Sequence, residues 1–239
     1  MTKGYLTVAT ELPAPGFWEG DDPATIHGGF EWGLAKALAD ELGLDLAVRA
    51  VSFADITAGR LHGADLALAQ VNATDERGAV AELTVPYYQT SPAALARPGT
   101  ESDLADLATV RKQHWVVQEG TTLETYLDDV VRPTEKPVVL ATTDAVVRAV
   151  VDGHADVALL DFPTALTVAA REGLSVPARF EHVEPIVGVL PAGSGNVQGV
   201  NEKLQRLMAN GTVDRLREKW LDPVFAVDPD RVPVIIAEE

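Results

Sequence analysis

Short apolar runs alternate along the chain with longer segments whose apolar residues recur every three to four positions. The run Tyr5–Thr10 is apolar and β-branched and predicts a strand, whereas Phe30–Leu42 has helical spacing and is followed by Gly43, a residue typical of helix ends. The same patterns predict strands at residues 46–51, 65–69, 115–118, 138–140, 156–160 and 186–190, and helices at residues 56–61, 121–131, 143–151, 161–171, 197–210 and 212–220. This alternation predicts an α/β fold with largely parallel sheets.

The alternation restarts after Tyr87, which indicates two α/β lobes. We predict a discontinuous first lobe from residues 1–91 and 187–239 and an inserted second lobe from residues 92–186, joined by two hinge strands. Each lobe is expected to be a mixed, mostly parallel sheet flanked by helices. Two lobes on short connections can hinge around a ligand. Ligands of such sheets bind beyond the carboxyl ends of the strands, so polar residues that follow the predicted strands are the candidates for a site.

Composition excludes several classes of function. The chain has 19 basic and 36 acidic residues, a formal charge of −17 that repels nucleic acid and anionic membranes and favours solubility. It has no cysteine, which excludes disulfides, thiolate nucleophiles and cysteine-ligated zinc. The five histidines are scattered and match no metal or catalytic motif, and no phosphate-binding glycine loop is present. We therefore expect no cofactor, no metal, no catalytic residue and no nucleic-acid partner.

Arg77 is the first candidate for a binding site. It follows the predicted strand 65–69, and a guanidinium at a strand exit suits a carboxylate because it offers two parallel, charge-assisted hydrogen bonds. A surface ion pair with Asp75, Glu76 or Glu82 is the alternative. The sequence leaves both interpretations open.

Two further candidates lie in the second predicted lobe. Gly120 and Thr121 stand where a strand gives way to a helix, and free N–H groups at a helix start attract anions. The alternative is that Thr121 or Thr122 only caps that helix. Asp161 ends another strand just before Pro163, where it either caps a helix or meets an ammonium group.

Seven segments of the chain resemble the polar amino acid-binding proteins of ATP-driven importers, the family-3 solute-binding proteins. They occur in the family's order and spacing, roughly between Leu6 and Trp220. The segments read LTVATE, GGFEWGLAKAL, DLALAQVNATDER, PYY, VVQEGTTLETYL, GHADVALLD and NGTVDRLREKW. The resemblance implies a two-lobed periplasmic-binding-protein-like fold.

The resemblance also implies roles for the ligand's two charged groups. Arg77 would bind the α-carboxylate, and Thr122 would hold the same carboxylate from the other lobe. Asp161 would bind the α-ammonium group. The backbone around Ala69 and the side chain of Asn72 would assist Asp161, and the backbone N–H groups of Gly120 and Thr121 would assist Thr122.

The side-chain pocket is implied less directly. Phe53 and an aromatic residue from Phe17 and Trp18 would sandwich the ligand side chain. Glu11 and Gln70 would lie beside it and favour a polar or cationic side chain. The segment that holds Glu31 departs from the family pattern, which has an aspartate at that position.

The resemblance implies an extracytoplasmic, non-enzymatic receptor that closes on a free amino acid and delivers it to an ABC transporter permease. Its export signal is expected to be absent from this chain. The acidic composition and the lack of an obvious exposed apolar stripe favour a monomer. A lyase of the cyclohexadienyl dehydratase kind is one alternative, with Glu119 as the acid that such chemistry would require. A ligand-sensing domain of a receptor is the other.

Overall fold

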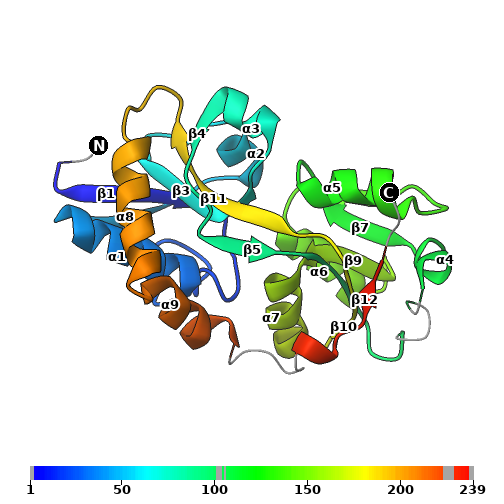
Figure 1. Ribbon diagram of the computed structural model, residues 1–239. Helices are drawn as coiled ribbons and strands as arrows, with labels where there is room; N and C mark the ends of the chain where they lie inside the picture. The colour runs from blue at the N-terminus through cyan, green and yellow to red at the C-terminus, as the bar shows by residue number, and fades with distance from the viewer. Residues whose placement is uncertain (1–2, 101–103, 105, 223–228, 237–239) are drawn as a thin grey trace. The chain divides into compact units, whose positions relative to one another are not determined.

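The computed structural model describes residues 3–100, 104, 106–222 and 229–236, which form two compact units (Figure 1). The first unit comprises residues 1–89 and 184–223, and the second comprises residues 90–183 and 224–239. Each unit contains one mixed sheet flanked by helices. This architecture confirms the predicted α/β fold class.

The sheet of the first unit has the strand order β2-β1-β3-β11-β4, and β5 pairs with β11. The strands are β1 (Tyr5–Thr10), β2 (Asp45–Ala50), β3 (Leu66–Asn72), β4 (Ala81–Leu83), β5 (Tyr88–Thr90) and β11 (Glu184–Pro191). The helices are α1 (Phe30–Leu42), α2 (Phe53–Thr57), α3 (Asp75–Val80), α8 (Val197–Ala209) and α9 (Thr212–Trp220). Strand β1 runs parallel to β2 and β3, whereas β11 runs antiparallel to β3 and β4.

The sheet of the second unit has the order β12-β10-β6-β9-β7-β8. Its strands are β6 (Pro92–Ala96), β7 (Trp115–Gln118), β8 (Val138–Leu140), β9 (Val157–Asp161), β10 (Ser175–Phe180) and β12 (Val234–Ile235). Its helices are α4 (Leu107–Val110), α5 (Thr122–Tyr126) with a π-helical turn at Leu127–Val131, α6 (Thr143–Val151) and α7 (Phe162–Glu172). A 3₁₀ turn, Pro229–Arg231, precedes β12.

Alternation along β6 explains how this second sheet is covered on both faces. Ala93 and Leu95 belong to one core cluster, which includes residues of α6 and α7, whereas Ala94 and Ala96 belong to another, which includes residues of α5. Successive strand residues point to opposite faces, so a continuously apolar strand fits a sheet that is buried on both sides.

Several predicted elements coincide with the structure. Strands β1, β7 and β8 and helices α1, α6 and α9 have the predicted bounds, and Gly43 ends α1 in the left-handed conformation. Helix α2 was predicted at residues 56–61 but begins at Phe53, because the Ser52 side chain accepts a hydrogen bond from the Asp55 N–H and caps it.

The sheets are mixed, as predicted, and β6 and β11 run antiparallel to strands on both sides. One prediction needs correction. The segment 187–239 was assigned whole to the first lobe, but β12 pairs with β10 in the second unit, Arg179 opposite Val234 and Phe180 opposite Ile235.

Candidate functional site

Arg77 lies against the carboxyl end of β3 in the first unit. Thr74 caps α3 by accepting a hydrogen bond from the Arg77 N–H, and this contact fixes the position of the Arg77 backbone. The side chain is buried, with 7% of the residue exposed; Nη1 donates to the Asn72 carbonyl at 2.7 Å, and Cζ lies 5.5 Å from the centroid of the Phe53 ring. Burial distinguishes Arg77 from a surface arginine, but its charge still acts on the exposed Glu76, whose pKa is lowered by its own backbone N–H, by Thr74 and also by Arg77.

Asn72 contributes a buried amide to the same place. The residue is 4% exposed, and among the described residues nothing accepts a hydrogen bond from its side-chain nitrogen. A buried donor without a partner costs about 1–3 kcal/mol, so an acceptor supplied by a ligand would relieve that cost. The nitrogen is a donor and suits a carboxylate, whereas the ammonium role that the resemblance implies would fall to the amide oxygen of the same side chain.

Glu11 and Phe53 are brought together, but through the backbone of Phe53. Glu11 Oε1 accepts a hydrogen bond from the Phe53 N–H at 2.9 Å, at the start of α2. This contact holds Phe53 where its ring meets Arg77. Glu11 therefore helps to build the first unit's part of the candidate site, as well as being a candidate to contact the ligand.

The prediction that Phe17 or Trp18 sandwiches the ligand is wrong for this structure. Both residues are 1% exposed. The ring of Phe17 packs edge-on against Tyr88 at 6.4 Å, and the Trp18 indole N–H donates to Glu31 Oε2 at 2.9 Å and to the Leu68 carbonyl at 3.1 Å. These contacts lie within the first unit and place both rings in its core.

Gln70 breaks the regularity of β3. Its φ of 53° is in the left-handed region, which is uncommon for a residue with a side chain. Its N–H donates to Glu31 Oε1 at 2.8 Å. Ala69, just before it, is buried. The strand therefore turns at Gln70 with help from a side chain of α1.

Glu31 was missed as a functional candidate. It has no exposed surface, and its carboxylate accepts hydrogen bonds from Tyr87 at 2.5 Å, from Gln70 and from Trp18. Burial raises its pKa to about 7, although the three hydrogen bonds act in the opposite direction. The signal in the sequence was an acid next to Phe30, on the apolar face of a predicted helix.

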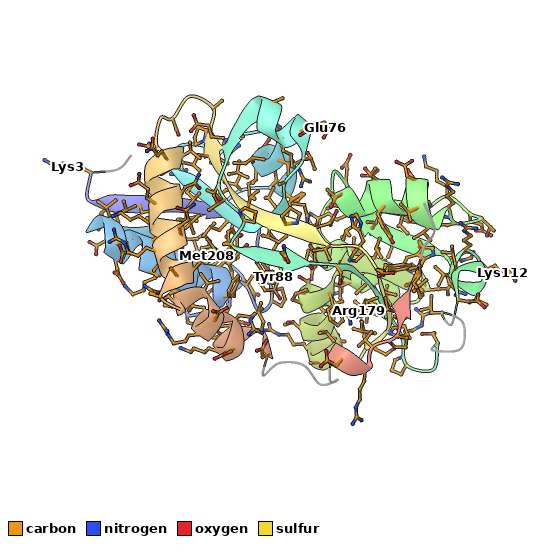
Figure 2. The ribbon with its side chains drawn as sticks, in the orientation of Figure 1. Lys3, Glu76, Tyr88, Lys112, Arg179 and Met208 are labelled. Atoms are coloured by element: carbon orange, nitrogen blue, oxygen red, sulfur yellow. The ribbon has the colours of Figure 1, made fainter. Side chains whose placement is uncertain are left out.

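In the second unit, Asp161 is the last residue of β9 and precedes α7. Its side chain makes no capping hydrogen bond to α7, so the cap interpretation does not account for it. The Phe162 N–H donates to the Ser91 carbonyl instead, at 2.9 Å. Arg179, labelled in Figure 2, lies over the Phe162 ring at 5.3 Å.

At the start of α5, the carboxylate of Glu124 from the same helix takes the place of an external anion. Thr121 is the N-cap, accepts from the Glu124 N–H and donates to the Gln118 carbonyl at 2.8 Å. The Gly120 N–H donates to Glu124 Oε2 at 2.8 Å, so this N–H group is occupied and not open to a ligand as predicted. Thr122 is half-buried in the first turn of the helix.

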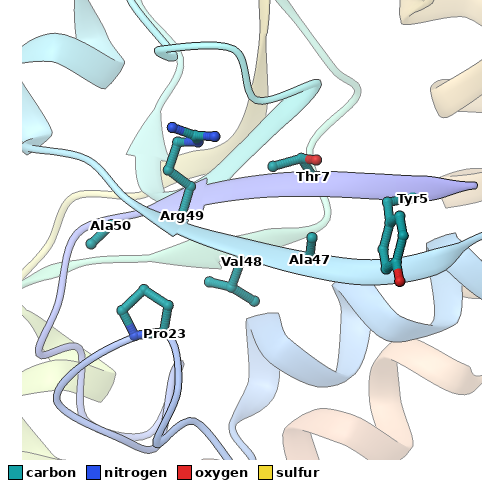
Figure 3. A pocket seen from close by; sticks show the side chains of 7 residues that line it. All are labelled: Tyr5, Thr7, Pro23, Ala47, Val48, Arg49 and Ala50. Carbon is teal, nitrogen blue, oxygen red and sulfur yellow. The ribbon is translucent and has the colours of Figure 1, made fainter. Parts of the chain in front are cut away.

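An open pocket of about 460 Å³ lies elsewhere, along β1 and β2 of the first unit (Figure 3). It is lined by Tyr5, Thr7, Pro23, Ala47, Val48, Arg49 and Ala50, and none of these is a candidate ligand-binding residue. Over the described ranges, no three acidic or histidine side chains gather in a way that could hold a metal ion. Within the same ranges, every helix is too short or too polar to span a bilayer.

Known proteins resemble this chain over almost its whole length. The family model for bacterial extracellular solute-binding proteins, family 3, matches residues 6–223. An ancestral amino acid-binding protein, a precursor of cyclohexadienyl dehydratase, has a crystal structure with a TM-score of 0.81 and 26% identity, covering 91% of this chain and 96% of that one. A Streptococcus pneumoniae amino acid ABC transporter substrate-binding protein bound to L-arginine has a TM-score of 0.80 and 27% identity, covering 93% and 94%.

A curated relative has a different name. The membrane-bound lytic murein transglycosylase F of Aeromonas salmonicida is 29% identical over 95% of this chain, but the match covers only 46% of that protein. The chain thus spans about half the length of the curated relatives it matches. The family match covers far more than half of this chain, and the two-unit fold agrees with it. The chain therefore belongs to the bacterial extracellular solute-binding proteins of family 3.

Proposed function

We propose that this protein binds a free amino acid and performs no chemistry on it. The observation that carries the proposal is the buried guanidinium of Arg77, which donates to the Asn72 carbonyl and lies over the Phe53 ring, together with the buried side-chain nitrogen of Asn72, which lacks an acceptor among the described residues. Both groups donate hydrogen bonds, which is the chemistry that a carboxylate requires.

A zwitterion needs a second partner for its ammonium group. A charged group that leaves water without a counter-charge pays a large desolvation cost, so both ends of the ligand must be matched. We assign the ammonium group to Asp161, because its side chain does not cap α7. Partners divided between the two units would favour a ligand-closed state by differential binding.

We infer a polar or cationic side chain for the ligand. Glu11 stands beside Phe53, and Gln70 is half-buried at the irregular point of β3. The streptococcal relative that binds L-arginine, at 27% identity, supports this inference. The proposal extends to an extracytoplasmic location and to delivery of the amino acid to an ABC transporter permease, both typical of this family.

The experiment is a thermal-shift screen of refolded, ligand-free protein against the free amino acids and against carboxylates that lack an amine. Ligand at about 100 times its Kd adds about 2.7 kcal/mol of stability. We expect a rise in Tm with one or a few amino acids, lost in Arg77→Ala and in Asp161→Ala.

Arg60→Ala is the matched control. Arg60 is an exposed arginine of the same unit that pairs with Asp55, so its removal should leave the ligand-induced shift unchanged. A shift with amine-free carboxylates alone would remove Asp161 from the site. The absence of a shift with every compound would refute amino acid binding.

A lyase of the cyclohexadienyl dehydratase kind is less well supported. Its acid would be Glu119, and this residue is exposed, so nothing around it provides the dry environment that a general acid at neutral pH needs. Steady turnover of prephenate by the protein would overturn the non-enzymatic assignment.

A sensing domain is the second candidate, because the curated relatives are about twice as long as the match. The mass of the native protein distinguishes the two functions. A native protein of about this chain's mass, 25.4 kDa, supports a free receptor, whereas a much larger one supports a domain of a longer protein.

A further inference from the structure

Strand β3 carries a backbone conformation that something must stabilise. Gln70 has a φ of 53°, and the pairing of β3 with β11 changes register opposite it, between Val187 and Val189. The left-handed conformation costs about 1–2 kcal/mol for a residue with a Cβ atom. A cost of this kind persists only where the surroundings hold the residue in place.

Glu31 supplies that stabilisation. Its carboxylate receives three donors from three separate segments: the Gln70 N–H, the Tyr87 hydroxyl and the Trp18 indole N–H. An ionised carboxylate only accepts hydrogen bonds, so all three donors match its charged form. Hydrogen bonds to an ionised group are shorter and stronger than neutral ones.

The three segments are those that would matter for ligand binding. Gln70 lies between Ala69 and Asn72, and the Asn72 carbonyl in turn receives the Arg77 guanidinium. Tyr87 immediately precedes β5, the strand by which the chain leaves the first unit (Tyr88 is labelled in Figure 2). A change at the Glu31 carboxylate therefore reaches the binding strand through one hydrogen bond.

The surroundings of Glu31 are nearly free of other charges. Tyr87 is the titratable group in contact with it; the preceding loop contributes the neutral indole of Trp18, and β3 contributes a backbone N–H. Helices α8 and α9 also pack against α1, but Arg206 of α8 pairs with Glu41 and Lys219 of α9 lies over the Trp220 ring. Burial accordingly dominates and raises the Glu31 pKa to about 7, within reach of ordinary changes in pH.

We propose that Glu31 is a positioning residue for the amino acid site, that its ionised carboxylate holds β3 in the shape that binds ligand, and that its protonation weakens binding. The Gln70 N–H and the Tyr87 hydroxyl both donate to Oε1, and the Trp18 N–H is shared between Oε2 and the Leu68 carbonyl. Protonation removes the negative charge that strengthens these hydrogen bonds, and so weakens the hold of Glu31 on the Gln70 N–H. The inference rests on the proposed function, because it concerns the regulation of that same site.

The test is calorimetric titration of the wild-type protein with L-arginine, or with the best amino acid from the screen, at pH 5.5 to 8.0. If ligand binding lowers the Glu31 pKa by one unit, affinity falls about tenfold as pH decreases across this range. Glu31→Gln keeps the shape and removes the charge, so we expect weak binding that is independent of pH. Glu41→Gln, on the same helix, is the matched control and should follow the wild type.

A second variant covers the case in which Glu31→Gln does not fold. Tyr87→Phe removes one donor that lowers the Glu31 pKa, so the midpoint of the affinity change should move to higher pH. The Gln70 amide resonance in ¹H–¹⁵N spectra of ligand-free protein should titrate with the same midpoint as the affinity.

The outcomes separate this inference from the proposed function. Tight binding with the same affinity at every pH, or a Glu31→Gln profile that matches the wild type, would overturn the role of Glu31 and leave the amino acid receptor intact. Failure of the wild type to bind any amino acid at any pH would overturn both.

Discussion

The end of β3 in the first unit and the start of α5 in the second are both polar, and both were predicted to contact the ligand. At the end of β3, the Asn72 amide nitrogen is buried without an acceptor and Arg77 is held at its side. At the start of α5, Glu124 fills the place where an anion would bind, by accepting from the Gly120 N–H. The end of β3 keeps a buried donor that lacks an acceptor among the described residues, whereas the Gly120 N–H at the start of α5 already has one. The first is the better guide to a ligand, and the contrast can be tested by three experiments.

The largest effect concerns Glu31 and the pH dependence of stability. Its folded pKa of about 7 lies above the ordinary value of 4.5, so the folded state binds more protons than the unfolded state between these values. Protonated Glu31 therefore adds about 3 kcal/mol to the free energy of unfolding below pH 4.5. This contribution is lost as the pH rises through 7.

Urea unfolding of the wild type and of Glu31→Gln at pH 4.5 to 8 measures this effect. We expect the free energy of unfolding of the wild type to fall, relative to the variant, as pH rises. Parallel curves would mean that the carboxylate is ionised throughout, and that burial does not dominate its pKa.

The next effect compares two helix caps of the same chemistry. Thr74 caps α3 and so positions Arg77, whereas Thr142 caps α6 in the second unit, a helix that carries no candidate residue. Thr74→Ala and Thr142→Ala should each cost about 1 kcal/mol of stability. Only Thr74→Ala should also weaken amino acid binding, as measured by calorimetry. An equal loss of affinity in both variants would show that the effect is not specific to the end of β3.

The smallest effect concerns Glu124. Glu124→Ala removes a partly buried carboxylate that accepts from the Gly120 N–H near the start of α5, and should lower stability by about 0.5 kcal/mol. Glu119→Ala, at an exposed neighbouring position, is the control and should have no effect. Thermal unfolding of both variants makes the comparison. A loss above about 2 kcal/mol would mean that the carboxylate organises this region as strongly as Glu31 organises β3.

Local signals predicted the elements that their own residues specify. Helix α1 was predicted correctly because its periodicity ends at Gly43, and β7 because its run is apolar and short. Strands β6 and β10 were missed because Pro92–Ala96 and Ser175–Phe180 are strands only through their partners in the sheet.

The site followed the same division. Arg77 and Asp161 were found because strand exits can be read from the sequence, and their roles remain predictions. Glu31 was missed because its importance comes from donors distant in the sequence, including Tyr87, and Phe17 was misassigned because a ring in a loop gives no sign of which partners will bury it. Contacts between distant segments decide both cases.

The short strand β12 has a consequence for any shortened form of the protein. It pairs with Arg179 and Phe180 at the outer side of β10, and without it that strand would present unpaired N–H and C=O groups to solvent. Such an edge is a template for pairing with another chain. A chain that ended with α9 would keep the helices of the first unit, but it would expose a sheet margin in the second and become prone to self-association. Strand β12 therefore covers a strand at which copies of the protein could otherwise pair.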